Sequence, residues 1–208
     1  MSFLINNQVE FIHIPKTAGV WIEHTFHDWI KLVGNRHDTG KNSDLWSFCV
    51  AREPVQWLTS AFFYIRPRLD ITSIRISSMK KKWIPQNWFP ASQFTNIGKL
   101  LTLSDRKATV NDFIAEYLRE MPGEYSRAVS EYTKNADRVL DFNRLRPQLL
   151  SMVEYRLKSH IVTKVKGRIL EGEPRNVSKK PEVVTVDPKH VAALREEPFY
   201  ENLKEVLK

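Results

Sequence analysis

Residues 11–21 read Phe-Ile-His-Ile-Pro-Lys-Thr-Ala-Gly-Val-Trp, an apolar run that stops at a short loop and continues at helical spacing. The strand-forming residues 9–14 carry no charge after Glu10, which is typical of a strand buried on both faces of a parallel sheet. From Gly19 the apolar side chains recur on one helix face as far as Val33, so the sequence predicts an amphipathic helix there.

The loop between this strand and this helix has the groups that bind an anion. A strand that feeds a helix through small residues directs backbone N–H groups and the positive end of the helix dipole at one point. Lys16 adds a mobile positive charge and Thr17 adds a hydroxyl, which suits a phosphate or a sulfate. The glycine spacing of a Walker A loop is missing. An ordinary strand-to-helix turn with a surface lysine is the alternative reading of this loop.

The same arrangement occurs a second time, after a polar, turn-rich segment at residues 34–44. Residues 45–51 predict another buried strand, which ends at Arg52. A proline two residues later suits the first turn of a helix that continues with apolar spacing to Ile65. Because ligands of open α/β sheets bind beyond the carboxyl ends of the strands, we expect Lys16 and Arg52 at the same edge.

Composition limits the class of protein. The 208 residues are 42% hydrophobic, which suits one globular domain over residues 1–208. No segment approaches membrane-spanning length and the opening residues do not resemble a secretion signal, so we expect a soluble, cytoplasmic protein without a membrane span. The single cysteine, Cys49, lies in an apolar run and is expected to be a small core residue rather than a nucleophile.

The charge favours an anionic partner without choosing one. Thirty-two basic residues against 24 acidic ones give a net charge of +8, which is compatible with a nucleotide, a nucleic acid, a sulfated or phosphorylated glycan, or a membrane surface. Basic and aromatic residues are interleaved at residues 66–90. They fit a single-stranded nucleic-acid surface or a flap over an acceptor, and simple packing of the aromatic rings onto the body explains them equally well.

The rest of the chain alternates helices and strands. A helix should begin at Thr109 and end at the breaker residues 121–123. The later expectations are a short helix or loop at 125–132, a strand at 136–142, a helix at 145–157, a charged tail from residue 167 and a last helix at 188–208.

The two loops together resemble the nucleotide-binding signatures of sulfotransferases that use 3′-phosphoadenosine 5′-phosphosulfate (PAPS). The first signature is residues 13–19, and the second is residues 50–61, in which Arg52 is followed eight residues later by Ser60. The likeness is to the carbohydrate, Golgi-type enzymes and their bacterial relatives, and it is strongest over residues 11–64. It implies a P-loop-like α/β fold, with a mainly parallel central sheet flanked by helices.

The resemblance also implies roles for single residues. The first loop would hold the 5′-phosphosulfate, with Lys16 stabilising the leaving phosphate as the S–O bond breaks. Arg52 would grip the 3′-phosphate through two parallel hydrogen bonds, and Ser60 would add a hydroxyl. Sulfuryl transfer, like phosphoryl transfer, depends on positioning and on stabilisation of charge. The nucleotide-binding residues implied are Lys16, Thr17, Ala18, Gly19, Val20, Trp21, Arg52, Ser60, Asn176, Ser178 and Lys179.

Some of these residues depart from the family pattern or have an alternative reading. Val20 and Trp21 stand where the family usually has two hydroxyl residues, although Trp21 resembles a tryptophan that cytosolic members place near the adenine. Residues 175–181 resemble the Asn-x-Ser loop that these enzymes fold over the nucleotide, and a plain linker is the alternative. His37 is our candidate for the general base, because carbohydrate-type members often have a histidine in that loop; an exposed polar residue is the alternative.

The sequence therefore predicts an enzyme that moves a sulfuryl group from PAPS to a hydroxyl of a carbohydrate or a small molecule, leaving 3′-phosphoadenosine 5′-phosphate (PAP). No metal is implied, because no cluster of His, Cys or carboxylate residues has ligand spacing, and no nucleic-acid partner is expected. A non-catalytic protein that binds PAPS or PAP is the alternative. A nucleotide kinase-like P-loop protein comes third, because its glycines and its Mg²⁺-site signature are missing.

Overall fold

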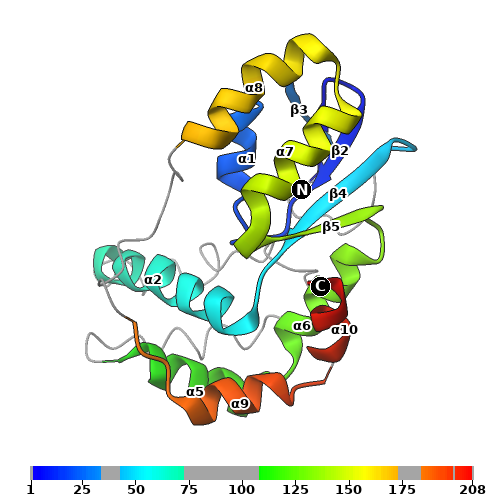
Figure 1. Ribbon diagram of the computed structural model, residues 1–208. Coiled ribbons are helices and arrows are strands. Elements are labelled where there is room, and N and C mark those ends of the chain that lie inside the picture. The colour runs from blue at the N-terminus through cyan, green and yellow to red at the C-terminus, as the bar shows by residue number, and fades with distance from the viewer. Residues whose placement is uncertain (1, 34–42, 73–107, 173–183, 199, 208) are drawn as a thin grey trace. The chain divides into compact units, whose positions relative to one another are not determined.

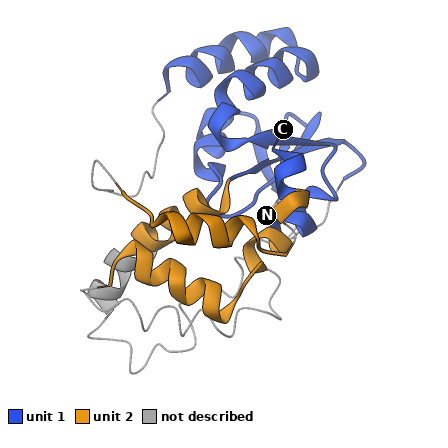
Figure 2. Cartoon of the chain, turned by 60° about the horizontal axis from the view of Figure 1, so that its bottom comes forward, with its two compact units in different colours: residues 1–52, 129–177, 203–208 blue, residues 53–128, 178–202 orange. Residues whose placement is uncertain are grey.

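The computed structural model describes residues 2–33, 43–72, 108–172, 184–198 and 200–207. These residues form two compact units, each built from separate stretches of the chain (Figure 2). Unit 1 contains residues 1–52, 129–177 and 203–208, and unit 2 contains residues 53–128 and 178–202. The expectation of a single domain over the whole chain stays a prediction.

Unit 1 is built on a sheet that is mixed rather than mainly parallel, which corrects the expected fold in that respect. Within the described residues the sheet has five strands in the order β3-β1-β2-β4-β5. β2, β4 and β5 are parallel neighbours, whereas β1 pairs antiparallel with β2 and with β3 (Figure 1). The strands are β1 (Ser2–Ile5), β2 (Val9–Ile12), β3 (Ile30–Val33), β4 (Trp46–Ala51) and β5 (Arg138–Asp141).

The antiparallel part of the sheet begins with a hairpin that the sequence analysis missed. Asn6 and Asn7 connect β1 to β2 with φ angles of 51° and 52°, a left-handed conformation that asparagine tolerates better than most residues. The N–H of Gln8 donates to the carbonyl of Ile5 at 3.0 Å and closes the turn. β1 thereby offers its other edge to a further antiparallel strand.

That further strand is β3, and it replaces the second half of the predicted helix. The helix α1 (Gly19–Thr25) ends early, and a turn leads into β3, whose Ile30 lies opposite Ile5 of β1. The prediction of one helix as far as Val33 was wrong because pairing with β1 outweighs the helical spacing of the apolar residues in this segment. Two of them, Ile30 and Val33, are β-branched and favour a strand, and the open edge of β1 supplies the backbone partners.

Helices cover the core of unit 1. The predicted helix at 145–157 is confirmed as α7 (Leu145–Arg156), and it packs against α8 (Ser159–Glu171), which in turn contacts α1. The expected charged tail was wrong in its start, because Gly167 lies inside α8. The shared core includes Phe11, Phe48, Leu149, Val153, Ile161 and Val165. Cys49 is buried in β4, as expected for a core residue, and burial raises the pKa of its thiol.

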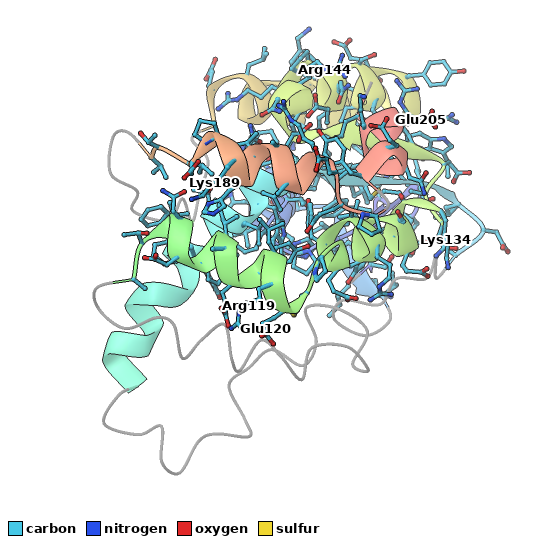
Figure 3. All side chains as sticks on the ribbon, turned by 90° about the horizontal axis from the view of Figure 1, so that it is seen from below. Arg119, Glu120, Lys134, Arg144, Lys189 and Glu205 are labelled. Carbon is cyan, nitrogen blue, oxygen red and sulfur yellow. The ribbon has the colours of Figure 1, made fainter. Side chains whose placement is uncertain are left out.

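Unit 2 is helical. It holds α2 (Pro54–Thr72), α5 (Val110–Glu120) and α9 (Pro188–Arg195), which contact one another. The chain crosses between the units inside α6 (Glu124–Thr133) and α10 (Tyr200–Val206). The predicted last helix is divided into α9 and α10, because Pro198 lacks the N–H that a continuous helix needs. Charged side chains of α5, such as the exposed Arg119 with its partner Glu120, pair at the surface (Figure 3), where such pairs add little stability.

The predicted start of α5 at Thr109 is confirmed by a capping box. The Thr109 hydroxyl accepts a hydrogen bond from the N–H of Asp112, and the Asp112 carboxylate accepts one from the N–H of Thr109. Replacing Thr109 by alanine should lower the free energy of unfolding by about 1 kcal/mol, whereas Thr109→Ser should retain it. Urea unfolding of both variants measures this. Equal stability of the two would contradict the role of the cap.

A buried carboxyl in unit 2 should make the stability of the chain depend on pH. Glu197 lies between α9 and α10 and is 6% exposed. Burial raises the pKa of its carboxyl from 4.5 to about 7, although the Gly123 N–H and the Tyr117 hydroxyl partly offset the shift. The folded chain thus holds this proton more tightly than the unfolded chain. Protonation of Glu197 therefore stabilises the folded chain. This stabilisation is fully present below the pKa of the carboxyl in the unfolded chain and is lost as the pH rises through about 7.

From about pH 5 to about pH 8 we therefore expect this group to lower the free energy of unfolding by roughly 2 kcal/mol. Glu197→Gln is neutral at every pH and should abolish that decrease. Urea unfolding across the pH range is the measurement, with Glu196→Gln as the matched control because Glu196 is exposed. The prediction fails if the Glu197 variant keeps the full pH dependence of the parent.

Candidate functional site

The candidate site lies where the three parallel strands of unit 1 end. β2, β4 and β5 point the same way, so their carboxyl ends share one edge of the sheet. The loop of residues 15–18 follows β2, Arg52 follows β4, and Phe142 follows β5. This edge is where open α/β sheets bind their ligands.

The loop after β2 has an unusual backbone. Lys16 and Ala18 have φ angles of 65° and 70°, a left-handed conformation that is uncommon for residues other than glycine. Such positions cost free energy and cluster at ligand-binding sites. The buried Thr17 between them donates its hydroxyl proton to the carbonyl of Ile14 at 2.7 Å. A hydroxyl has one proton, so Thr17 cannot also donate to an anion in this arrangement.

The start of α1 is set by close contact between Gly19 and His13. A Cβ added to Gly19 would lie 1.8 Å from Nε2 of His13, so only glycine fits there. The imidazole is buried and stacks on the ring of Phe11, with centroids 5.8 Å apart. Its Nδ1 lies 3.8 Å from a carboxylate oxygen of Glu23. His13 is thus a packed residue whose ring lies between Phe11 and Gly19, the residue that follows the loop.

Arg52 connects the loop after β4 to the loop after β2 by a hydrogen bond. Its Nη1 donates to the carbonyl oxygen of Lys16 at 3.2 Å, so Lys16 and Arg52 lie at the same edge, as expected. The carbon of the guanidinium lies 3.9 Å from the centroid of the Phe142 ring. Arg52 as a whole residue is 8% exposed. The site therefore places a guanidinium directly beside a loop of left-handed backbone that carries a lysine.

This arrangement can bind a compact anion with two or more charges. A guanidinium offers paired donors to phosphate, and the backbone N–H groups of a loop with left-handed residues can form an anion-binding concavity. The helix dipole adds less than expected, because α1 has only seven residues and few peptide dipoles add up along it.

Two more predicted residues of the loop differ sharply in exposure. Val20 is 41% exposed at the start of α1. Trp21 is 7% exposed and belongs to the core of unit 1, with the guanidinium carbon of Arg146 lying 5.8 Å from its ring. Trp21 therefore packs in this structure, and its predicted place near an adenine stays a prediction.

The remaining predicted site residues belong to unit 2 or lie outside the described residues. Ser60 is buried on the second turn of α2 and belongs to unit 2. His37, Asn176, Ser178 and Lys179 lie outside the described residues. Their roles stay predictions.

Two residues of unit 1 near the loops were missed in the sequence. Phe142 ends the strand predicted at 136–142, so its place at the edge of the sheet could have been inferred from the same reasoning that placed Arg52. Arg146 had no such signal. It donates to the carbonyls of Ile169, Leu170 and Gly172 at the end of α8, where helix carbonyls need partners.

Comparisons of the chain with protein-family models, with curated proteins and with solved structures find no significant match. Among the described residues, no helix combines the length and the apolar character needed to cross a bilayer. The same residues contain no group of three or more His, Cys, Asp or Glu side chains placed to hold a metal ion. The function must be inferred from the residues at the strand ends and their geometry.

Proposed function

We propose that the chain binds PAPS and transfers its sulfuryl group to an acceptor hydroxyl. The observation that supports this most is the hydrogen bond from Arg52 to the Lys16 carbonyl. It brings side by side the two loops whose sequences resemble the signatures for the 5′-phosphosulfate and the 3′-phosphate. PAPS carries its 5′-phosphosulfate and its 3′-phosphate on the same ribose, so it requires two anion sites that are close together.

In the proposed reaction an acceptor oxygen attacks the sulfur in line with the bridging oxygen of the 5′-phosphosulfate. The new S–O bond forms as the bridging S–O bond breaks, and PAP leaves with the electron pair on its phosphate oxygen. Lys16 stabilises this developing negative charge. The proton of the acceptor hydroxyl passes to a general base, for which His37 is the proposed residue. The acceptor is a hydroxyl of a carbohydrate or a small molecule.

A non-catalytic protein that binds PAPS or PAP is the second candidate, and two observations favour it. Val20 occupies a position where the family has a hydroxyl, and the Thr17 hydroxyl donates to Ile14 instead of facing an anion. Fewer donors at the phosphosulfate would slow the transfer, while Lys16 and Arg52 would still bind the nucleotide. Arg52 and Lys16 have the same binding roles in both candidates.

Calorimetric titration with three nucleotides tests the binding part. We expect PAP to bind roughly 100-fold more tightly than 5′-AMP, because two charge-assisted hydrogen bonds to the 3′-phosphate add about 3 kcal/mol. Adenosine 2′,5′-bisphosphate carries the same charge as PAP in another geometry and should bind more weakly than PAP. Equal, weak affinities for PAP and 5′-AMP would rule out both candidates.

Transfer of labelled sulfate from PAPS to a panel of glycans and small hydroxyl compounds separates the two candidates. Transfer above the rate of spontaneous hydrolysis supports the enzyme. Tight binding of PAP with no transfer to any acceptor favours the non-catalytic protein.

Adding a hydroxyl at position 20 should improve the loop. Threonine has nearly the shape of valine, and the site is partly exposed, so Val20→Thr should fold normally and offer a donor near the proposed phosphosulfate. We expect the affinity for PAPS, or the rate of transfer, to rise about fivefold, which corresponds to one hydrogen bond of about 1 kcal/mol. Titration and the transfer assay measure it. Val20→Ala, which lacks the hydroxyl, should show no gain.

A further inference from the structure

Phe142 lies against the guanidinium to which the proposed function gives the main role. It begins the short 3-10 helix η2 (Phe142–Arg144), directly after β5. The distance of 3.9 Å between the Arg52 guanidinium carbon and the ring centroid is well inside the range of a cation–π contact. β5 is the parallel neighbour of β4, and Asp141 lies opposite Ala51 in their register. The sheet therefore places the residues after these two strands next to each other.

The turn that carries the ring is held on both sides by hydrogen bonds. The Asp141 carboxylate accepts from the N–H of Asn143 at 2.9 Å and from Nε of Arg144 at 3.0 Å. Arg144 also donates to the carbonyl of Leu207 at 2.8 Å. The N–H of Asp141 donates to the side-chain oxygen of Gln148 at 2.7 Å. The ring itself packs against the hydrophobic core of unit 1, so it offers a rigid surface.

Arg52 is thus restrained by two different contacts. The Phe142 ring lies on the guanidinium, and the Lys16 carbonyl accepts from its Nη1. A free arginine side chain loses considerable rotamer entropy when it binds a ligand. A guanidinium already held in place loses less, and preorganisation of this kind increases both affinity and selectivity.

We propose that Phe142 is a positioning residue that sets the selectivity of the site for an adenosine carrying a 3′-phosphate. This inference rests on the proposed function, in which Arg52 binds that phosphate. The ring orients the paired donors of Arg52 toward the 3′-phosphate and makes no contact with the 5′ end. Loss of the ring should therefore weaken binding of nucleotides with a 3′-phosphate and leave 5′-AMP nearly unaffected.

Titration of PAP and 5′-AMP into Phe142→Leu and Phe142→Tyr tests this. A cation–π contact of about 1.4 kcal/mol corresponds to tenfold in affinity. We expect Phe142→Leu to bind PAP about tenfold more weakly and 5′-AMP within about twofold of the parent. Phe142→Tyr keeps the ring and should retain the preference for PAP. Phe142→Met, a flexible residue of similar volume, replaces the leucine variant if that variant does not fold.

A second background isolates the contact from general packing. In Arg52→Gln the cation is gone, so adding Phe142→Leu should change the affinity for PAP less than twofold. The inference is overturned if Phe142→Leu weakens PAP and 5′-AMP equally, or if it leaves the preference for PAP unchanged. A parent chain with no preference for PAP over 5′-AMP would overturn the proposed function and this inference with it.

Discussion

Arg52→Ala is expected to weaken binding of PAP by about 3 kcal/mol, or roughly 150-fold. The substitution removes the paired donors that the proposal gives to the 3′-phosphate. It also removes the hydrogen bond to the Lys16 carbonyl, so binding of 5′-AMP should fall as well, by about threefold, because a typical hydrogen bond contributes about 1 kcal/mol or less. The preference for PAP over 5′-AMP should therefore nearly disappear.

Two variants control this experiment. Arg52→Lys keeps the charge without the fork of donors and should lose an intermediate amount of affinity. Arg156→Ala removes an exposed arginine of unit 1 that stacks on Trp46, at 4.4 Å from its ring centroid. Trp46 begins β4, whereas Arg52 follows its end, so this variant should keep the full preference for PAP. An Arg52→Ala chain that still prefers PAP over 5′-AMP would show that the 3′-phosphate binds elsewhere.

Gly19→Ala is expected to lower the free energy of unfolding by about 3 kcal/mol, the effect of a methyl group forced into a filled space. The new Cβ would lie 1.8 Å from Nε2 of His13, with two carbons of the same ring also within 2.4 Å. His13 cannot move freely, because its ring is buried and stacks on Phe11. Either the imidazole or the first turn of α1 must shift. Denaturant unfolding followed by circular dichroism measures the loss.

Gly167 supplies a matched control for this substitution. It lies in α8, and a Cβ added there would meet nothing within 4 Å. Gly167→Ala should therefore stabilise the chain by roughly 0.5–1 kcal/mol through helix propensity. The double variant His13→Ala, Gly19→Ala removes the clash, so the alanine at position 19 should cost much less in that background. If Gly19→Ala is as stable as the parent, the close contact between His13 and Gly19 does not exist.

Elements with local signals were predicted well. α5 has a cap at Thr109, an apolar face and a breaker in residues 121–123, and all of these signals lie within the helix or directly beside it. The same holds for β2 and β4, whose buried, strand-forming residues are followed by a proline or by Arg52. α7 was recognised from its apolar spacing alone.

Elements that depend on partners distant in sequence were predicted poorly. The apolar positions 26, 29, 30 and 33 have helical spacing, and pairing with β1, which is distant from them in sequence, decides for a strand. The antiparallel part of the sheet was missed for this reason. α8 was missed because many of its residues are charged, and the apolar spacing of the buried positions 161, 165 and 169 was therefore overlooked.

The amino-acid sequence alone was enough to predict that two buried strands each end in a loop with a cation, Lys16 in one and Arg52 in the other. It could do so because strand and loop patterns are local. Three contacts became visible only in the folded chain: Arg52 donates to the Lys16 carbonyl, Phe142 lies on the Arg52 guanidinium, and His13 leaves room for nothing larger than glycine at position 19. These contacts join residues far apart in the chain, or packed together across a turn, and they depend on strand order and side-chain packing, which no local pattern specifies.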